Sequence, residues 1–425
     1  MILKHSIKKQ RITLMIYEFI CFIALTMAYT MVIQPKFSYM GFELDFNIYN
    51  FLIGIALLIF FNLIGIFIKN NIIYAIWHII LIYNFYGTVI YYQYNNTSIN
   101  IVISLSIFLL VMIIFSKINI KIKKSKYTVE NNYFIMRRLT FLAIIATIPF
   151  FIFYGKYINI KNLLLIDVYE TRALFREVSV NGIGYLIAPL TRVVCPVLLA
   201  YSIKYKKKSI FLLNLFVILY IYLCGAVKSI FIGAITVIVF YRGDYEEKPI
   251  LFAKLIMFLT IGGILLYYMF DNIFLLDGFV RRVFFIPPKL DSEYYMYFNG
   301  HNTYWLHSAI GELLGIQRQI LGGYDSLSMY TGEVLMGKPG FNANVGVLTE
   351  GYVSAGYIGV LIHSILISFI YRIISSININ PILFGVIFIY IYYLNTAFLS
   401  VLLLTHGLLF LLLFSIMFLN RNVSN

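Results

Sequence analysis

Uncharged apolar runs recur along the whole chain, and they restrict its fold more than any other feature. Each is close to the roughly 20 residues that a helix needs to cross a bilayer. Such runs must be helical because backbone polar groups find no water inside lipid. Charged residues make up only 12% of the 425, against roughly 25% in a soluble domain. The sequence therefore predicts an all-α, polytopic integral membrane protein.

We expect about 12 transmembrane helices, with a close turn between two of them near Gly225 and Lys228. The expected spans are 12–34, 48–68, 71–92, 99–116, 139–155, 182–203, 209–225, 228–241, 250–270, 351–371, 381–397 and 399–419.

The net charge of +15 reflects basic residues between the apolar runs, which favours a topological role over nucleic-acid binding. Lys and Arg gather before the first expected span, from Lys117 to Arg138, from Lys204 to Lys208, and near both Arg372 and Arg421. The positive-inside rule places these segments, and therefore both termini, in the cytoplasm.

We expect one membrane domain over residues 1–425 with two outward segments, a smaller one at 156–181 and a large periplasmic loop at 271–350. The large loop is rich in Tyr, Phe, Leu and Gly, so we expect it to fold against the membrane domain. Apolar residues at helical spacing over 305–320 predict an amphipathic helix with His307, Ser308, Glu312 and Arg318 largely on its polar side.

Several chemistries have no sequence support. Cys21, Cys195 and Cys224 all lie in apolar runs and form neither a disulfide framework nor a metal motif. The segment from Gly332 to Lys338 resembles a phosphate-binding loop, but Pro339 follows where Ser or Thr would bind magnesium. We expect no metal site and no cofactor.

Two pairs of outward-facing arginines are candidate anion ligands. Arg172 and Arg176 are four residues apart, which places them on one face if that stretch is helical. Arg281 and Arg282 follow the end of a span. Arginine forks bind phosphate oxygens in a bidentate manner, while anchoring to lipid headgroups is the other interpretation.

Arg192 and Glu18 lie within expected spans, where a charge is costly. For Arg192 a functional role and a buried polar contact are equally open, and for Glu18 we favour a structural ion pair. The aromatic cluster around Tyr294 suits either sugar stacking or the membrane interface, and the interface is the more common use.

Two stretches carry a family resemblance. Residues 281–298 read RRVFFIPPKLDSEYYMYF, and residues 340–363 read GFNANVGVLTEGYVSAGYIGVLIH. Both resemble segments of the Wzy-type O-antigen polymerases. In that family an Arg at the end of a span leads into prolines and aromatics, and an Asn–x–Asn segment precedes a glycine-punctuated span.

The resemblance implies a glycosyltransferase that polymerises oligosaccharide repeats on undecaprenyl pyrophosphate at the periplasmic face of the bacterial inner membrane. Membrane lipids surround it, and a flippase and a chain-length regulator are implied partners. Arg281, Arg172 and Arg176 would stabilise the pyrophosphate charge, assisted by Arg282 and Arg192. His301 and Glu350 are the candidate bases. Asn342 and Asn344 either bind sugar hydroxyls or shape the turn before the span, and Tyr294 would contact sugar.

Two other functions stay open. An O-antigen ligase, which moves the chain to lipid A core, would share the topology and the arginines. A flippase for lipid-linked oligosaccharides would have a similar number of spans, but we expect its outer loops to be short. The sequence does not separate O-antigen from capsule or exopolysaccharide repeats.

Overall fold

The chain is helical throughout the part that the structure describes. The computed structural model describes residues 2–125, 128–130, 132–164, 168–178, 180, 182–225 and 227–420. About three quarters of the chain is helix (76%), and none of these described residues lies in a strand. The all-α prediction is confirmed.

Nine helical stretches in the described ranges are long and apolar enough to cross a bilayer, which confirms a multi-pass membrane protein. They are Lys9–Met40, Ile48–Gly65, Asn71–Tyr94, Tyr133–Tyr157, Gly184–Lys204, Lys208–Gly225, Glu247–Phe270, Val347–Ser376 and Leu399–Leu419.

The other three expected spans are also helical but shorter. They are α6 (Asn100–Ser116), α12 (Lys228–Val239), and η9 (Pro381–Leu383) continued by α19 (Phe384–Tyr393). The expected turn is confirmed, because α11 ends at Gly225 and α12 begins at Lys228. That these three helices cross the bilayer stays a prediction.

The chain divides into two compact units, each built from separate stretches of sequence. Unit 1 comprises Met1–Ile118, Tyr245–Arg372 and Ile391–Ser400. Unit 2 comprises Asn119–Asp244, Ile373–Tyr390 and Val401–Asn425. Both units contain long apolar helices, so the division separates two groups of helices within the expected membrane domain.

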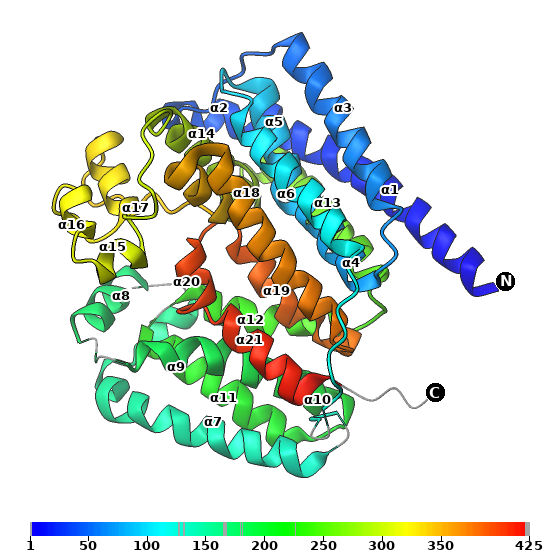
Figure 1. Cartoon of the computed structure of the whole chain (residues 1–425), viewed down its shortest axis with the longest axis vertical. Helices are drawn as coiled ribbons and strands as arrows, with labels where there is room; N and C mark the ends of the chain where they lie inside the picture. The colour runs from blue at the N-terminus through cyan, green and yellow to red at the C-terminus, as the bar shows by residue number, and fades with distance from the viewer. Residues whose placement is uncertain are drawn as a thin grey trace. The chain divides into compact units, whose positions relative to one another are not determined.

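Unit 1 is organised around one buried helical rod, formed by α4 (Asn71–Ile80), η3 (Leu81–Phe85) and α5 (Tyr86–Tyr94). The most apolar stretch of this rod is entirely buried. Long helix α13 (Glu247–Phe270) lies along α1 (Ile2–Ala28) and also contacts α4 (Figure 1). The remaining N-terminal elements of the unit are η1 (Tyr29–Ile33), α2 (Gln34–Phe37), η2 (Ser38–Met40) and α3 (Ile48–Gly65).

Glu18 forms the structural ion pair that the sequence predicts. Its Oε1 lies 2.7 Å from Nδ1 of His78, and both side chains are almost fully buried. The central rod therefore supplies a partner for one oxygen of the carboxylate on α1.

The segment 271–350 is folded, as its composition predicts. A hydrophobic cluster joins residues from the whole segment to the next helix: Tyr294, Phe298, Leu321, Leu327, Ala343, Val345 and Val353. Its helices are η7 (Leu276–Phe285), α14 (Ile286–Tyr297), α15 (Ala309–Leu313), α16 (Gln317–Ile320), α17 (Leu327–Tyr330) and η8 (Thr331–Leu335).

The prediction of one amphipathic helix over 305–320 is wrong. The chain forms turns up to Ser308 and then two short helices, α15 and α16. Gly315 separates them with a φ of +71°, a left-handed conformation that ends a helix and suits glycine. His307, expected on the polar side, is buried at 1% exposure.

The stretch α18 (Val347–Ser376) consists of two helices that meet at a sharp reversal. Ala355 and Gly356 leave helical geometry, and Gly356 has a φ of +60°. Gly351 and Gly359 meet across the reversal, where a Cβ on Gly359 would lie 1.9 Å from the carbonyl oxygen of Gly351. The prediction that these glycines permit close helix packing is confirmed, and both packing partners belong to this one segment.

Unit 2 is also a helical bundle, in which α11 (Lys208–Gly225) contacts α7, α10 and α12. Cys195 and Cys224 are buried and free there, as is Cys21 in unit 1. The other elements of unit 2 include α7 (Tyr133–Tyr154), η4 (Gly155–Tyr157), η5 (Ile160–Leu164), α8 (Val168–Glu177), α9 (Gly184–Ala188), η6 (Pro189–Val194), α10 (Cys195–Lys204), α21 (Leu408–Phe414) and η10 (Ser415–Leu419).

Candidate functional site

Glu350 is the buried carboxylate at the centre of the candidate site in unit 1. It lies on the short helix that precedes the reversal in α18 and is 1% exposed. Its Oε2 accepts a hydrogen bond from the backbone N–H of Leu399. Two imidazoles flank it: His307 Nε2 is 3.8 Å from Oε1, and His363 Nδ1 is 3.9 Å from Oε2.

The hydrogen bonds of His363 identify it as a neutral ring. Its Nδ1 is 2.7 Å from the carbonyl oxygen of Val347, which only accepts, so Nδ1 carries the proton. Its Nε2 is 2.9 Å from Nε1 of Trp305, which only donates, so Nε2 is the acceptor. Both ring nitrogens are satisfied, and His363 therefore adds no charge beside Glu350.

His307 differs because one of its nitrogens remains available. Its Nδ1 is 2.6 Å from the Thr303 hydroxyl, which also lies 3.2 Å from the carbonyl oxygen of Val353. The Thr303 hydroxyl thus joins the imidazole to the backbone of α18. Nε2 is buried, has no hydrogen-bond partner among the described residues, and faces Glu350. The imidazole and the carboxylate thus lie side by side, 3.8 Å apart, and make a candidate acid–base pair.

A strap formed by residues 303–308 closes over this pair. The N–H groups of Thr303 and Tyr304 donate to the carbonyls of Val353 and Ser354, at 3.0 and 2.8 Å, and so cap the short helix. Tyr304 and Trp305 have φ angles of +50° and +62°, which cost side-chain-bearing residues on the order of 1 kcal/mol or more each. Such strain is typical of functional sites.

Arg281, a predicted pyrophosphate ligand, is buried and already bound to a carboxylate. Its Nε donates to Asp277 at 2.7 Å, and its Nη2 donates to the same oxygen. The guanidinium lies 4.3 Å from the ring centre of Phe37, and Nη1 is 3.4 Å from the sulfur of Met40. These contacts hold η7 against the elements that follow α1.

Four other predicted residues lie at the surface of unit 1: Arg282, His301, Asn342 and Asn344. The Arg282 side chain makes no ion pair or hydrogen bond within the described part of the chain. His301 donates from Nδ1 to the Asn299 carbonyl at 3.2 Å. Asn344 and Asn342 are joined through their backbones at 3.0 Å, which leaves their amides exposed.

The proposed sugar contact by Tyr294 needs correction. Its ring is fully buried in the hydrophobic cluster of segment 271–350, and its hydroxyl donates to the carbonyl of Ala343 at 2.8 Å. An aromatic ring without exposed surface cannot stack on a sugar. Tyr294 therefore joins α14 to the Asn–x–Asn segment.

The remaining predicted arginines belong to unit 2. Arg172 and Arg176 both lie in α8, so the helix that their spacing required is present. The Arg176 side chain lies outside the described side chains, and Arg172 is partly buried. Arg192 is buried in η6, a π-helical turn within the span Gly184–Lys204. The arginines are thus divided between the two units, with Arg281 and Arg282 in unit 1.

The sequence analysis missed the two histidines of the site. His307 had a signal, because it directly follows Trp305 and Leu306, but the expected helix assigned it to a polar face. His363 ends the glycine-rich stretch as a polar residue inside an apolar run, which is itself a sign of a buried contact.

Within the described residues, no group of three or more His, Cys, Asp or Glu side chains is placed to hold a metal ion together. Comparison of the chain with known protein families, with curated proteins and with solved structures yields no match.

Proposed function

We propose that the chain is a membrane-embedded glycosyltransferase that polymerises oligosaccharide repeats carried on undecaprenyl pyrophosphate, at the periplasmic face of a bacterial inner membrane. One observation carries the proposal: the two stretches that resemble the polymerase family pack together, and one of them carries Glu350, which lies 3.8 Å from His307.

The contact between the stretches is specific and polar. The hydroxyl of Tyr294 donates to the carbonyl of Ala343 at 2.8 Å, and the hydroxyl of Thr349 donates to Asp291 at 2.5 Å. Residues 281–298 and 340–363 are separated by more than forty residues in sequence. Motifs that carry one function are expected to meet in space, which favours a shared site for them.

Glu350 and His307 supply the proton chemistry that glycosyl transfer requires. An acceptor hydroxyl of the incoming repeat loses its proton to the pair as its oxygen bonds to the anomeric carbon of the growing chain. The bond from that carbon to the pyrophosphate oxygen breaks, and undecaprenyl pyrophosphate leaves with the bonding electrons. A base positioned in this way typically contributes about 10²–10⁴-fold.

The leaving pyrophosphate needs positive charge, and Arg282 is the best ligand in unit 1. It is exposed and makes no ion pair within the described residues, whereas Arg281 is neutralised by Asp277. Arg172 on α8 is the candidate in unit 2. The strap at Tyr304 and Trp305 covers the acid–base pair, so substrate access requires the strap to open.

Deleting the gene in its host and resolving the surface polysaccharide on a gel tests this function. We expect the ladder of chain lengths to disappear while a single repeat remains attached to the core. The wild-type gene restores the ladder, Glu350→Gln reduces chain growth by about 100-fold or more, and Arg282→Ala reduces it by about 10-fold. Two surface variants of the same loop, Glu312→Gln and Arg318→Ala, serve as matched controls and restore it.

Other outcomes reject the proposal. Loss of every repeat from the surface would instead indicate a ligase or a flippase. These two differ in turn, because a ligase mutant accumulates finished chains on lipid and a flippase mutant accumulates single repeats on the cytoplasmic side. Full rescue by Glu350→Gln would remove the acid–base role and keep the polymerase.

A further inference from the structure

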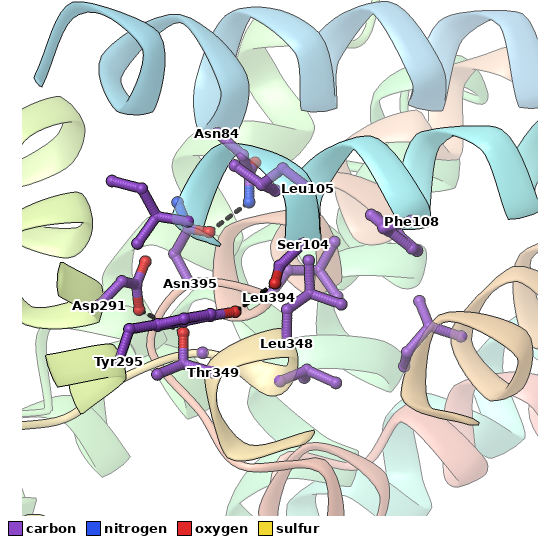
Figure 2. A pocket seen from close by; sticks show the side chains of 14 residues that line it. Asn84, Ser104, Leu105, Phe108, Asp291, Tyr295, Leu348, Thr349, Leu394 and Asn395 are labelled. Atoms are coloured by element: carbon purple, nitrogen blue, oxygen red, sulfur yellow. Dashed lines mark hydrogen bonds between the residues drawn. The ribbon is translucent and has the colours of Figure 1, made fainter. Parts of the chain in front are cut away.

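Unit 1 contains a small cavity, lined by apolar and polar side chains, that the proposed chemistry does not use (Figure 2). Its volume is about 30 Å³, enough for one or two water-sized occupants. Asp291 is the only charged residue that lines it. Oxygen-bearing side chains form much of the remaining wall: Asn84, Ser104, Tyr295, Thr349 and Asn395.

Two of these side chains come from places where regular α-helical geometry is interrupted, and a third lies on a short helix. Asn84 lies in η3, a π-helical turn within the buried rod. Asn395 lies in the turn that follows α19, and Thr349 lies on the short helix before the reversal in α18. Irregular backbone of this kind inside a membrane protein is tolerated where it is buried by protein or lines a cavity, and it often forms ion sites.

The described part of the protein supplies few partners for the negative charge of the Asp291 carboxylate. Its only hydrogen bond within the described residues is the one from Thr349, and no described cation forms an ion pair with it. Burial accordingly raises the pKa of Asp291 to about 7, although the Thr349 hydrogen bond acts in the opposite direction. Asp291 is half-buried, and a carboxylate that is partly removed from water with one hydrogen-bond donor favours a nearby positive charge.

Asn84 has a second unmet polar atom. Its Nδ2 donates to Oδ1 of Asn395, whereas its own Oδ1 is buried and has no hydrogen-bond partner among the described residues. The residue is only 5% exposed. The residues that line the cavity therefore include one carboxylate and one side chain with an unused amide oxygen.

We propose that this cavity binds a monovalent cation of the size of sodium, held by the Asp291 carboxylate and by the neutral oxygens of Asn84 and Thr349. Hard cations of this kind prefer oxygen ligands. A single carboxylate balances one positive charge. Calcium takes about six to eight oxygen ligands, commonly with several carboxylates, and a cavity of this size with one carboxylate does not supply them.

The ionisable groups near the cavity do not alter the balance between the Asp291 carboxylate and one bound cation. On α14, Tyr294 and Tyr295 are the nearest, and the Tyr295 hydroxyl donates to Ser104 at 2.5 Å. Among the elements packed against α14, α6 has no ionisable residue, and α5 carries only tyrosines, Tyr86, Tyr91, Tyr92 and Tyr94. The η7 helix carries the paired Asp277 and Arg281 and the exposed Arg282, and the short helix of α18 carries Glu350.

Cation-dependent stability of the purified full-length protein in lipid nanodiscs tests the site. Thermal unfolding is measured at pH 8 in sodium, potassium or choline chloride at equal ionic strength, and binding of radioactive sodium is measured directly. We expect sodium to raise Tm by about 2–4 °C over choline, with saturable binding of one ion per chain.

Three variants make the result specific. Asp291→Asn removes the charge and resembles the protonated form, so it should fold and lose both the Tm rise and the binding. Thr349→Val removes one oxygen at constant shape and should weaken the sodium affinity at least several-fold. Glu293→Gln, a carboxylate-to-amide change on the same helix outside the cavity, should behave like the wild type.

Three results would overturn the proposal: an equal Tm rise in all salts, sodium binding that survives Asp291→Asn, or no sodium effect in the wild type. The readouts do not depend on glycosyl transfer, so failure here leaves the polymerase proposal untouched, and the reverse also holds.

Discussion

Thr349 and Glu350 are consecutive residues on one helical turn, but they serve two buried polar regions that differ in construction. Glu350 lies between two imidazoles and accepts a backbone N–H from Leu399. Asp291, bound by Thr349, has one hydrogen bond and an open cavity beside it. Burying a carboxylate is expensive unless it is paired or hydrogen-bonded. In the first region the fold itself supplies the partners of Glu350. In the second, the cavity beside Asp291 leaves space for a bound cation.

The largest effect should come from a change that disturbs both regions at once. In Gly359→Ala the new Cβ would lie 1.9 Å from the backbone oxygen of Gly351, so the short helix with Thr349 and Glu350 must move. We expect Tm to fall by an amount equivalent to about 2–3 kcal/mol. Tryptophan fluorescence during heating measures this change.

Gly262→Ala is the matched control for that variant. Gly262 lies in α13, and a Cβ there has open space around it. Alanine favours a helix over glycine by about 1 kcal/mol, so Tm should stay unchanged or rise. If both alanine variants behave alike, the reversal in α18 is not under steric control.

A pH titration should separate the two regions. Burial raises the pKa of Asp291 from 3.8 to about 7 in the folded chain. At pH values between these two numbers, the folded state therefore binds more protons than the unfolded state. Stability from this group is therefore full below about pH 4 and is lost as pH rises through about 7. In choline buffer, we expect the wild type to lose roughly 1–3 kcal/mol relative to Asp291→Asn between pH 5 and pH 8. Equal pH slopes in the two proteins would contradict the raised pKa.

The smallest effect should come from the hydrogen bond that keeps His363 neutral. Trp305→Phe removes the N–H that donates to His363 and leaves a buried acceptor unsatisfied, at a cost of about 1 kcal/mol. The matched control is Trp77→Phe, because the Trp77 N–H is buried and has no hydrogen-bond partner among the described residues. Thermal unfolding followed by circular dichroism compares the two, and a loss in Trp305→Phe no larger than in Trp77→Phe would remove this role.

Much of the fold was predictable, because hydrophobic run length is a direct consequence of bilayer thickness. Each of the twelve expected spans contains helix, although the one at 351–371 also contains the reversal at Gly356, and a helix break follows Gly225 as expected. Periodicity predicted one continuous amphipathic helix over 305–320, and it could not show that Gly315 and the left-handed Tyr304 and Trp305 interrupt this segment. Short apolar repeats do not reveal where a chain turns.

The candidate site was predictable only in part. Glu350 follows from its place at the start of a span, but the partner that makes it an acid–base group, His307, comes from a turn whose geometry is set by tertiary contacts. Arg281 was predicted as a ligand from its position at the end of a span. Asp277 stands four residues earlier, the spacing of an ion pair on a helix, and it binds this guanidinium, so the sequence did carry a signal that Arg281 has a partner.

The buried rod of unit 1 also has a consequence for how the protein is made. Among the nine long apolar stretches of the described chain, Asn71–Tyr94 has the lowest mean hydropathy, 1.5, and its most apolar stretch is completely enclosed. It carries His78, Asn84, Thr88 and Gln93 into the protein interior. Its contacts include α13 and η7, which are synthesised only after the first half of unit 2. During biosynthesis this buried stretch is therefore made before some of its packing partners exist. Until the later helices emerge, the insertion machinery or early neighbours such as α1 and α3 must shield its polar side chains from lipid.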